Sequence, residues 1–200
     1  AGYFRLKLGD GDVGAGGSIV FRGGETSDSS VGGIMHYRSE YSEKTSSGVT
    51  SLLTSNAGLG GESGAIQLAS GTSSAGTTGS VIVFTGQSTG GKGGDIVVSV
   101  GDGHTGSGGD ISVSSGKTKD SNRGGDMTLI TGYSSQTSSG SFLINTPNAG
   151  KSGVSGSISL TTGNGNNGQS GEFIIKSGDA LNGKAGSVSM KIGTGDKDNG

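Results

Sequence analysis

Apolar residues recur along this chain in pairs separated by one residue, and each pair follows a glycine. Gly94 is followed by Ile96 and Val98, and Gly109 is followed in the same way by Ile111 and Val113. The fourth residue after the glycine is apolar in every repeat, and the second is apolar in every repeat except at Thr50. Alternation with a period of two is typical of a β-strand that buries one face. The pattern therefore predicts one short strand per repeat.

One glycine, called the anchor glycine below, opens each of thirteen repeats, and successive anchors are 15 or 16 residues apart. The sixth residue after the anchor is mostly Ser or Thr, and another glycine usually follows it, which indicates a turn that closes the strand. The match runs from end to end, so no linker interrupts it. The anchors are Gly2, Gly17, Gly33, Gly48, Gly64, Gly79, Gly94, Gly109, Gly125, Gly140, Gly156, Gly171 and Gly186.

Self-similarity at a fixed short period is the signature of a solenoid. We expect an all-β fold, a parallel β-solenoid (β-helix), with about fifteen residues per strand-turn unit. Steps from odd to even repeats are always 15, which favours coils of two strands and about 31 residues; a three-unit coil of about 46 stays open. Residues 1–200 are expected to form one continuous domain, uncapped at both ends, as a segment of a longer chain or fibre.

Composition narrows the function classes. Glycine supplies 46 of 200 residues and only 28% are hydrophobic, which is too little for the thick core of an ordinary globule. The formal net charge is −2, so no basic excess indicates a nucleic-acid partner. The sequence contains no apolar run long enough to predict membrane insertion. It also contains no cysteine, so disulfide bonds do not stabilise the fold. No motif calls for a cofactor.

Catalytic chemistry has few candidates, and we expect no enzyme activity. The two histidines, His36 and His104, are far apart in the repeat, and no cysteine nucleophile exists. Asp95, Asp110 and Asp126 occupy equivalent positions and are interpreted as solvated residues of Gly-rich corners. The segment 90–97 contains one copy of the nonapeptide calcium motif GGxGxDxUx of RTX proteins, which makes Asp95 a weak calcium candidate. A family that uses tandem nine-residue copies does not share this fifteen-residue period.

The outward positions of the predicted strands differ between alternate repeats. Odd repeats are mostly polar or basic there, whereas even repeats carry apolar side chains. An apolar stripe of this length is typical of a contact surface, so we predict a lateral interface with a neighbouring rod. Its residues are Val20, Leu53, Ile82, Phe84, Leu143 and Ile174.

The segment Gly108–Gly116, which reads GGDISVSSG, resembles the Gly/Ser-rich tandem repeats of large surface proteins from algae and other protists. In general style it is also similar to β-solenoid stalks of bacterial adhesins. The resemblance implies secretion and an extracellular or cell-surface role. The expected function is a structural one: a stiff rod or filament built by axial strand stacking, with head-to-tail and lateral self-association. Carbohydrate, O-linked or in a matrix, is a further expected partner, and the alternative is a binding module such as an adhesin stalk or an ice-binding solenoid.

Overall fold

The computed structural model describes residues 3–9 and 16–195, and this part of the chain contains no helix and no strand. The predicted all-β fold, a parallel β-solenoid with two strands per coil, is therefore wrong for the single chain. The chain divides into two compact units, Ala1–Ser99 and Val100–Gly200. The expectation of one continuous domain stays a prediction.

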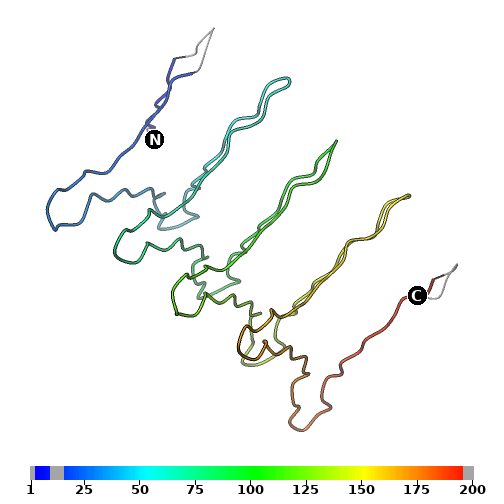
Figure 1. Cartoon of the computed structure of the whole chain (residues 1–200). Coiled ribbons are helices and arrows are strands. Elements are labelled where there is room, and N and C mark those ends of the chain that lie inside the picture. The colour runs from blue at the N-terminus through cyan, green and yellow to red at the C-terminus, as the bar shows by residue number, and fades with distance from the viewer. Residues whose placement is uncertain (1–2, 10–15, 196–200) are drawn as a thin grey trace. The chain divides into compact units, whose positions relative to one another are not determined.

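Within the described residues, each repeat consists of an extended segment and a closing loop (Figure 1). The extended segment runs from the anchor glycine to the sixth residue after it, and the closing loop joins that residue to the next anchor. At the base of the loop the two ends touch. A β-carbon placed on Gly94 would lie 3.4 Å from Thr85 Cγ2, and one on Gly171 would lie 3.4 Å from Thr162 Cβ. The same approach joins Ser39 to Gly48, Ser70 to Gly79, Thr131 to Gly140, Thr146 to Gly156 and Ser177 to Gly186.

Loop length accounts for the two repeat lengths. Ser39 meets Gly48 across eight loop residues, whereas Ser115 meets Gly125 across nine, and the extended segments have one length throughout. The extra residue of a 16-residue repeat therefore lies in the loop. The least exposed residues of the described chain are the loop-closing residues Ser39, Ser115, Thr131, Thr146 and Ser177, each about half-buried.

Backbone hydrogen bonds reinforce several loop bases. The Gly33 N–H donates to Gly24 O over 2.9 Å, and the Gly140 N–H donates to Gly132 O over 2.8 Å. In both cases the donor is an anchor glycine and the acceptor lies one residue after the loop-closing position. These bonds pair backbone groups that an exposed loop would otherwise leave to water.

Hydroxyl groups order the loop interiors in a recurring way. Ser73 Oγ accepts from the Gly76 N–H at 2.9 Å, and Ser88 Oγ accepts from the Gly91 N–H at 3.0 Å. In each loop the hydroxyl lies six residues before the next anchor and the donor three residues before it, which is the local side-chain-to-backbone bonding typical of Ser in turns. Asn167, with a φ of 61°, turns its loop through the left-handed region that Asn tolerates.

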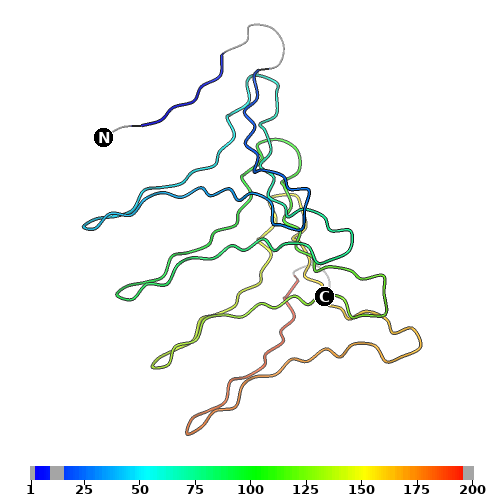
Figure 2. The same ribbon diagram turned by 90° about the vertical axis from the view of Figure 1, so that its left-hand side faces the viewer.

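The directions in which successive loops extend do not support a coil of two extended segments either. Within residues 100–200, the loop that follows Val100 (green) and the loop that follows Thr146 (yellow) extend in the same direction (Figure 1). The two loops between them in the sequence extend in other directions, as the turned view shows (Figure 2). Within this unit the loop direction therefore recurs after three repeats, without forming the strands of a solenoid coil.

Residues 3–9 and 16–195 form no buried core. None of the described residues is buried, and the accessible surface of the chain is 20795 Å². A compact protein of this size exposes about 8,500 Å² and a fully unfolded chain about 28,000 Å². The physical reason is that each repeat offers two apolar side chains against the entropy of ordering fifteen or sixteen residues, nearly a quarter of them glycine. The closing loops form despite this entropic cost, whereas the burial of two apolar side chains per repeat does not suffice to stack whole coils on one another.

Substitution of Gly33 by Ala is expected to open the loop that this glycine closes. The new β-carbon would lie 2.6 Å from the backbone nitrogen of Gly24, so the backbone must move and the hydrogen bond to Gly24 O is lost. With about 1 kcal/mol for that bond, hydrogen exchange of the residue 33 amide rises about five-fold. NMR exchange rates measure this, with Gly86→Ala as the control because open space surrounds Gly86. Equal exchange of the residue 33 amide in both variants would contradict the loop-base contact.

Candidate functional site

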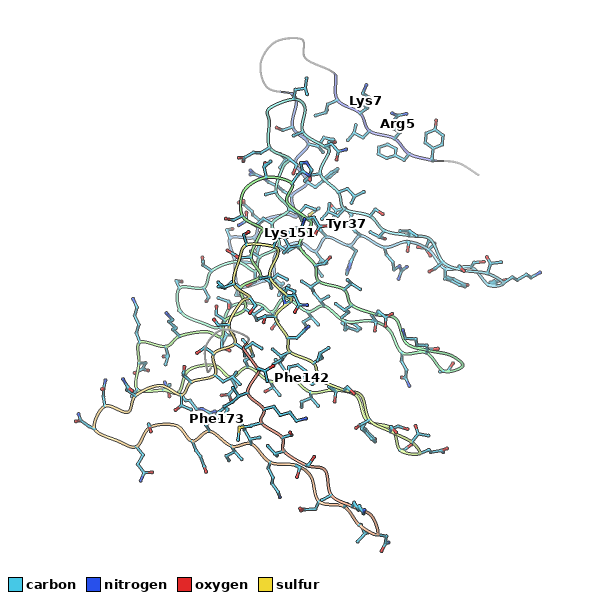
Figure 3. All side chains as sticks on the ribbon, turned by 90° about the vertical axis from the view of Figure 1, so that its right-hand side faces the viewer. Arg5, Lys7, Tyr37, Phe142, Lys151 and Phe173 are labelled. Atoms are coloured by element: carbon cyan, nitrogen blue, oxygen red, sulfur yellow. The ribbon has the colours of Figure 1, made fainter. Side chains whose placement is uncertain are left out.

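Apolar side chains form the most extensive chemical feature of the described chain. They stand on the extended segments at the second and fourth positions after each anchor, and we call this set the apolar face. Ile96 is 54% exposed, Val98 is 75% exposed and the intervening Val97 is 81% exposed. In this segment the residues at the second and fourth positions are therefore less exposed than the residue between them, although none of the three side chains is buried. Phe142 and Phe173, both at second positions, belong to this face (Figure 3).

The six residues of the predicted lateral interface are all exposed, each by about two thirds or more. Their neighbours on the apolar face are exposed as well, because no second layer of chain covers them. The structure therefore does not separate an outward apolar stripe from an inward core. Lateral contact through Val20, Leu53, Ile82, Phe84, Leu143 and Ile174 stays a prediction.

Asp95, the calcium candidate, lies beside a lysine. Lys92 Nζ is 2.8 Å from Asp95 Oδ1 and 2.9 Å from Asp95 Oδ2, so the carboxylate forms an exposed ion pair with the ammonium group. Calcium requires six to eight oxygen ligands. The described residues contain no group of three or more His, Cys, Asp or Glu side chains that could hold a metal ion.

Asp126, a second acidic candidate, is arranged in the same way. Asp126 forms an ion pair with Arg123, three residues before it, just as Asp95 pairs with Lys92. In both repeats the basic residue lies two residues before the anchor glycine and the aspartate lies one residue after it. The ion pair therefore connects the end of the closing loop to the start of the next extended segment. Both pairs are exposed, and exposed pairs of this kind are weak. They support the interpretation of these Asp residues as solvated corner residues.

One shallow hollow lies beside His36. Tyr37, Arg38 and Glu40 line it with His36, and Arg38 Nη2 lies 3.4 Å from Glu40 Oε1. His104, the other histidine, belongs to the second compact unit. Its lining includes one carboxylate, that of Glu40, and no Ser, Thr or Cys side chain.

The loop hydroxyls are the feature that sequence reasoning underestimated. Their spacing predicted a turn, but not that the same Ser or Thr contacts the following anchor glycine. Asp28 illustrates their electrostatic effect: hydrogen bonds from the Thr26 hydroxyl at 2.7 Å, then from the Ser30 N–H at 2.8 Å, hold the pKa of this carboxyl below its usual value. Both bonds favour the ionised form.

A pH titration tests that turn. The lowered pKa of Asp28 means that its hydrogen bonds stabilise the turn above the ordinary pKa of 3.8, and that this contribution disappears as the pH falls through the lowered pKa. We expect carbon-detected NMR to show Asp28 titrating below 3.8. In Thr26→Val the pKa of Asp28 should move back toward that value. An unchanged titration in the variant would contradict the assigned hydrogen bond.

The described residues contain no helix of the length and apolarity that crossing a bilayer demands.

Comparison with known proteins identifies no similar protein. No protein-family model, no curated protein and no solved structure matches the chain, so the candidate site stands on its own residues: an exposed apolar face, repeated along loop-closed segments.

Proposed function

We propose that this chain is a structural, self-assembling repeat protein that forms an extracellular rod or filament, and that it has no catalytic activity. The observation that carries the proposal is the apolar face. Its side chains recur in each of thirteen repeats, yet they remain exposed in the single chain. Association with further copies is the way for such a chain to remove them from water.

The exposed area supports association on a large scale. The accessible surface of 20795 Å² exceeds the roughly 8,500 Å² expected for a compact chain by far more than the roughly 1,600 Å² buried in a standard protein interface. Each repeat adds a similar small patch, so many weak contacts act together once the first has formed. A net charge of −2 over 200 residues opposes this assembly very little.

The partner is a second copy of the chain because the spacing of the patches is characteristic of this sequence. A surface with an apolar pair every 15 or 16 residues is matched, repeat for repeat, by the same surface. The extended segments also carry backbone N–H and C=O groups that a neighbouring segment can pair. The extracellular setting rests on the general likeness of the Gly/Ser-rich repeats to those of surface proteins.

Assembly is tested by sedimentation velocity over a concentration series, with electron microscopy of the concentrated samples. We expect single chains at low concentration and elongated assemblies above a critical concentration. Raising ammonium sulfate should lower that concentration, since excluded salts strengthen apolar burial. A single sedimenting species without filaments over the whole series, up to millimolar chain, would overturn the proposal.

A further inference from the structure

The chain contains a longer period than the single repeat. Its closing loops have eight, nine, eight, nine, eight and eight residues, and this order then occurs a second time. Gly2, Gly94 and Gly186 mark the boundaries, so one block of six repeats spans 92 residues. We call the repeats from Gly2 the first block and those from Gly94 the second block.

The structure reproduces this period in its hydrogen bonds. The bond from the Gly33 N–H to Gly24 O recurs from Gly125 to Gly116, and the bond from the Gly48 N–H to Glu40 O recurs from Gly140 to Gly132. Each donor and each acceptor of the first block is 92 residues before its equivalent in the second block. Two loop interiors also recur at this distance: Ser42 with Thr45 and Ser134 with Thr137, and Thr26 with Asp28 and Thr118 with Asp120.

The loop-closing position shows the same period. It carries an apolar side chain where each block begins, at Leu8, Val100 and Ile192, whereas the other repeats mostly carry Ser or Thr. Leu8 meets Gly17 and Val100 meets Gly109, so the equivalent contacts form in both blocks. The division of the chain into two compact units after Ser99 lies close to the block boundary at Gly94.

We propose that copies of this chain associate with a stagger of 92 residues, so that the second block of one copy lies against the first block of the next. The inference rests on the proposed function, because it specifies the register of that assembly. Of the shifts that leave more than one loop in overlap, only two pair every loop with a loop of equal length: none, and six repeats. Any other such shift sets a nine-residue loop against an eight-residue loop, which leaves one residue with unpaired backbone groups.

Charge distinguishes the two shifts that remain. Without a stagger, each of the 30 charged residues faces the same residue of the neighbour, like charge against like. With a stagger of 92 residues, Glu25 faces Lys117, an opposite charge, and Arg38 faces Ile130. Like charges then meet at few places, among them Asp28 with Asp120 and Lys92 with Lys184. A staggered contact is also heterologous and does not close, so it continues into a filament.

Two single-residue deletions test the stagger on the full chain. The nine-residue loops 55–63 and 147–155 occupy equivalent places in the two blocks, and both contain Asn-Ala-Gly. Their local geometry agrees: a β-carbon on Gly61 would lie 3.7 Å from Ala57 Cβ, and one on Gly153 would lie 3.9 Å from Ala149 Cβ. Deleting Asn56 shortens the first loop to eight residues, and deleting Asn148 shortens its equivalent. Eight-residue loops occur throughout the chain, so each deletion preserves a loop type that the chain already uses.

The stagger predicts a distinctive set of results, read as the critical concentration in sedimentation and as filaments in the microscope. Each single deletion sets a short loop against a long one at every contact and should raise the critical concentration about ten-fold, equivalent to about 1.4 kcal/mol. The double deletion should assemble like the unmodified chain. An equimolar mixture of the two single deletions should also assemble, because the short loop of one variant then faces the short loop of the other.

Contact without a stagger predicts the reverse, with each single deletion assembling alone and the two variants sorting into separate filaments. That result, or equal assembly of all the variants and their mixture, would overturn the stagger while leaving the proposed function intact. Failure of the unmodified chain to assemble would instead overturn the proposed function itself.

Discussion

Replacing Ile96 with Asp is expected to raise the critical concentration for assembly about 100-fold or more. Ile96 stands on the apolar face at the second position of its repeat and is among the less exposed side chains there. Association that covers this face would bury a carboxylate without a partner, at a cost of several kcal/mol, and 2.8 kcal/mol already corresponds to about 100-fold. Sedimentation of the variant over a concentration series gives the value.

Ser112→Asp is the matched control for that experiment. Ser112 lies on the opposite side of the neighbouring extended segment, at the third position after Gly109, so its substitution adds the same charge away from the apolar face. We expect its critical concentration to stay within about two-fold of the unmodified chain, because an added exposed charge costs little. Equal losses in Ile96→Asp and Ser112→Asp would show that general charge, and not the apolar face, controls assembly.

A second large effect is expected in calorimetry. A cooperative domain of 200 residues absorbs about 140 kcal/mol at its melting temperature near 60 °C. The single chain contains no buried side chain among its described residues, so we expect no unfolding peak from dilute samples below the critical concentration. Above that concentration a heat-absorbing transition should appear with dissociation of the assembly, and its midpoint should rise with concentration. A sharp peak of that size from dilute single chains would contradict an open chain.

The repeat itself was fully readable from the sequence, because the anchor glycines and the apolar pairs keep their spacing through thirteen units. The alternation matches the lower exposure of Ile96 relative to Val97, whereas Phe4 and Met190, which also stand on the apolar face, are almost fully exposed. The turn at the sixth position was predicted from Ser and Thr, and residues such as Thr131 and Ser177 do lie at the loop bases. These features are local, so a single repeat contains the information for them.

The prediction of a β-solenoid failed at the next level, where repeats must pack on one another. A period of two indicates that a face is suited to burial, but it does not say which surface covers that face. Ile96 and Val98 were interpreted as inward residues of a coil, although burial against another copy of the chain would satisfy the same pattern. Calcium binding at Asp95 stays a prediction, and the ion pair between Lys92 and Asp95 is a contact that the motif alone did not predict. The 92-residue block is present in the loop lengths, and hydrogen bonds at equivalent positions of the two blocks reproduce it.

Amide hydrogen exchange of the dilute and the assembled chain tests the central claim most directly. The claim is that the extended segments are open to water in the single chain and are covered when copies associate. We predict that the amides of residues 96–98 exchange at nearly the unprotected rate below the critical concentration and at least about 100-fold more slowly in filaments. Strong protection of these amides in dilute single chains, unchanged on assembly, would contradict the account.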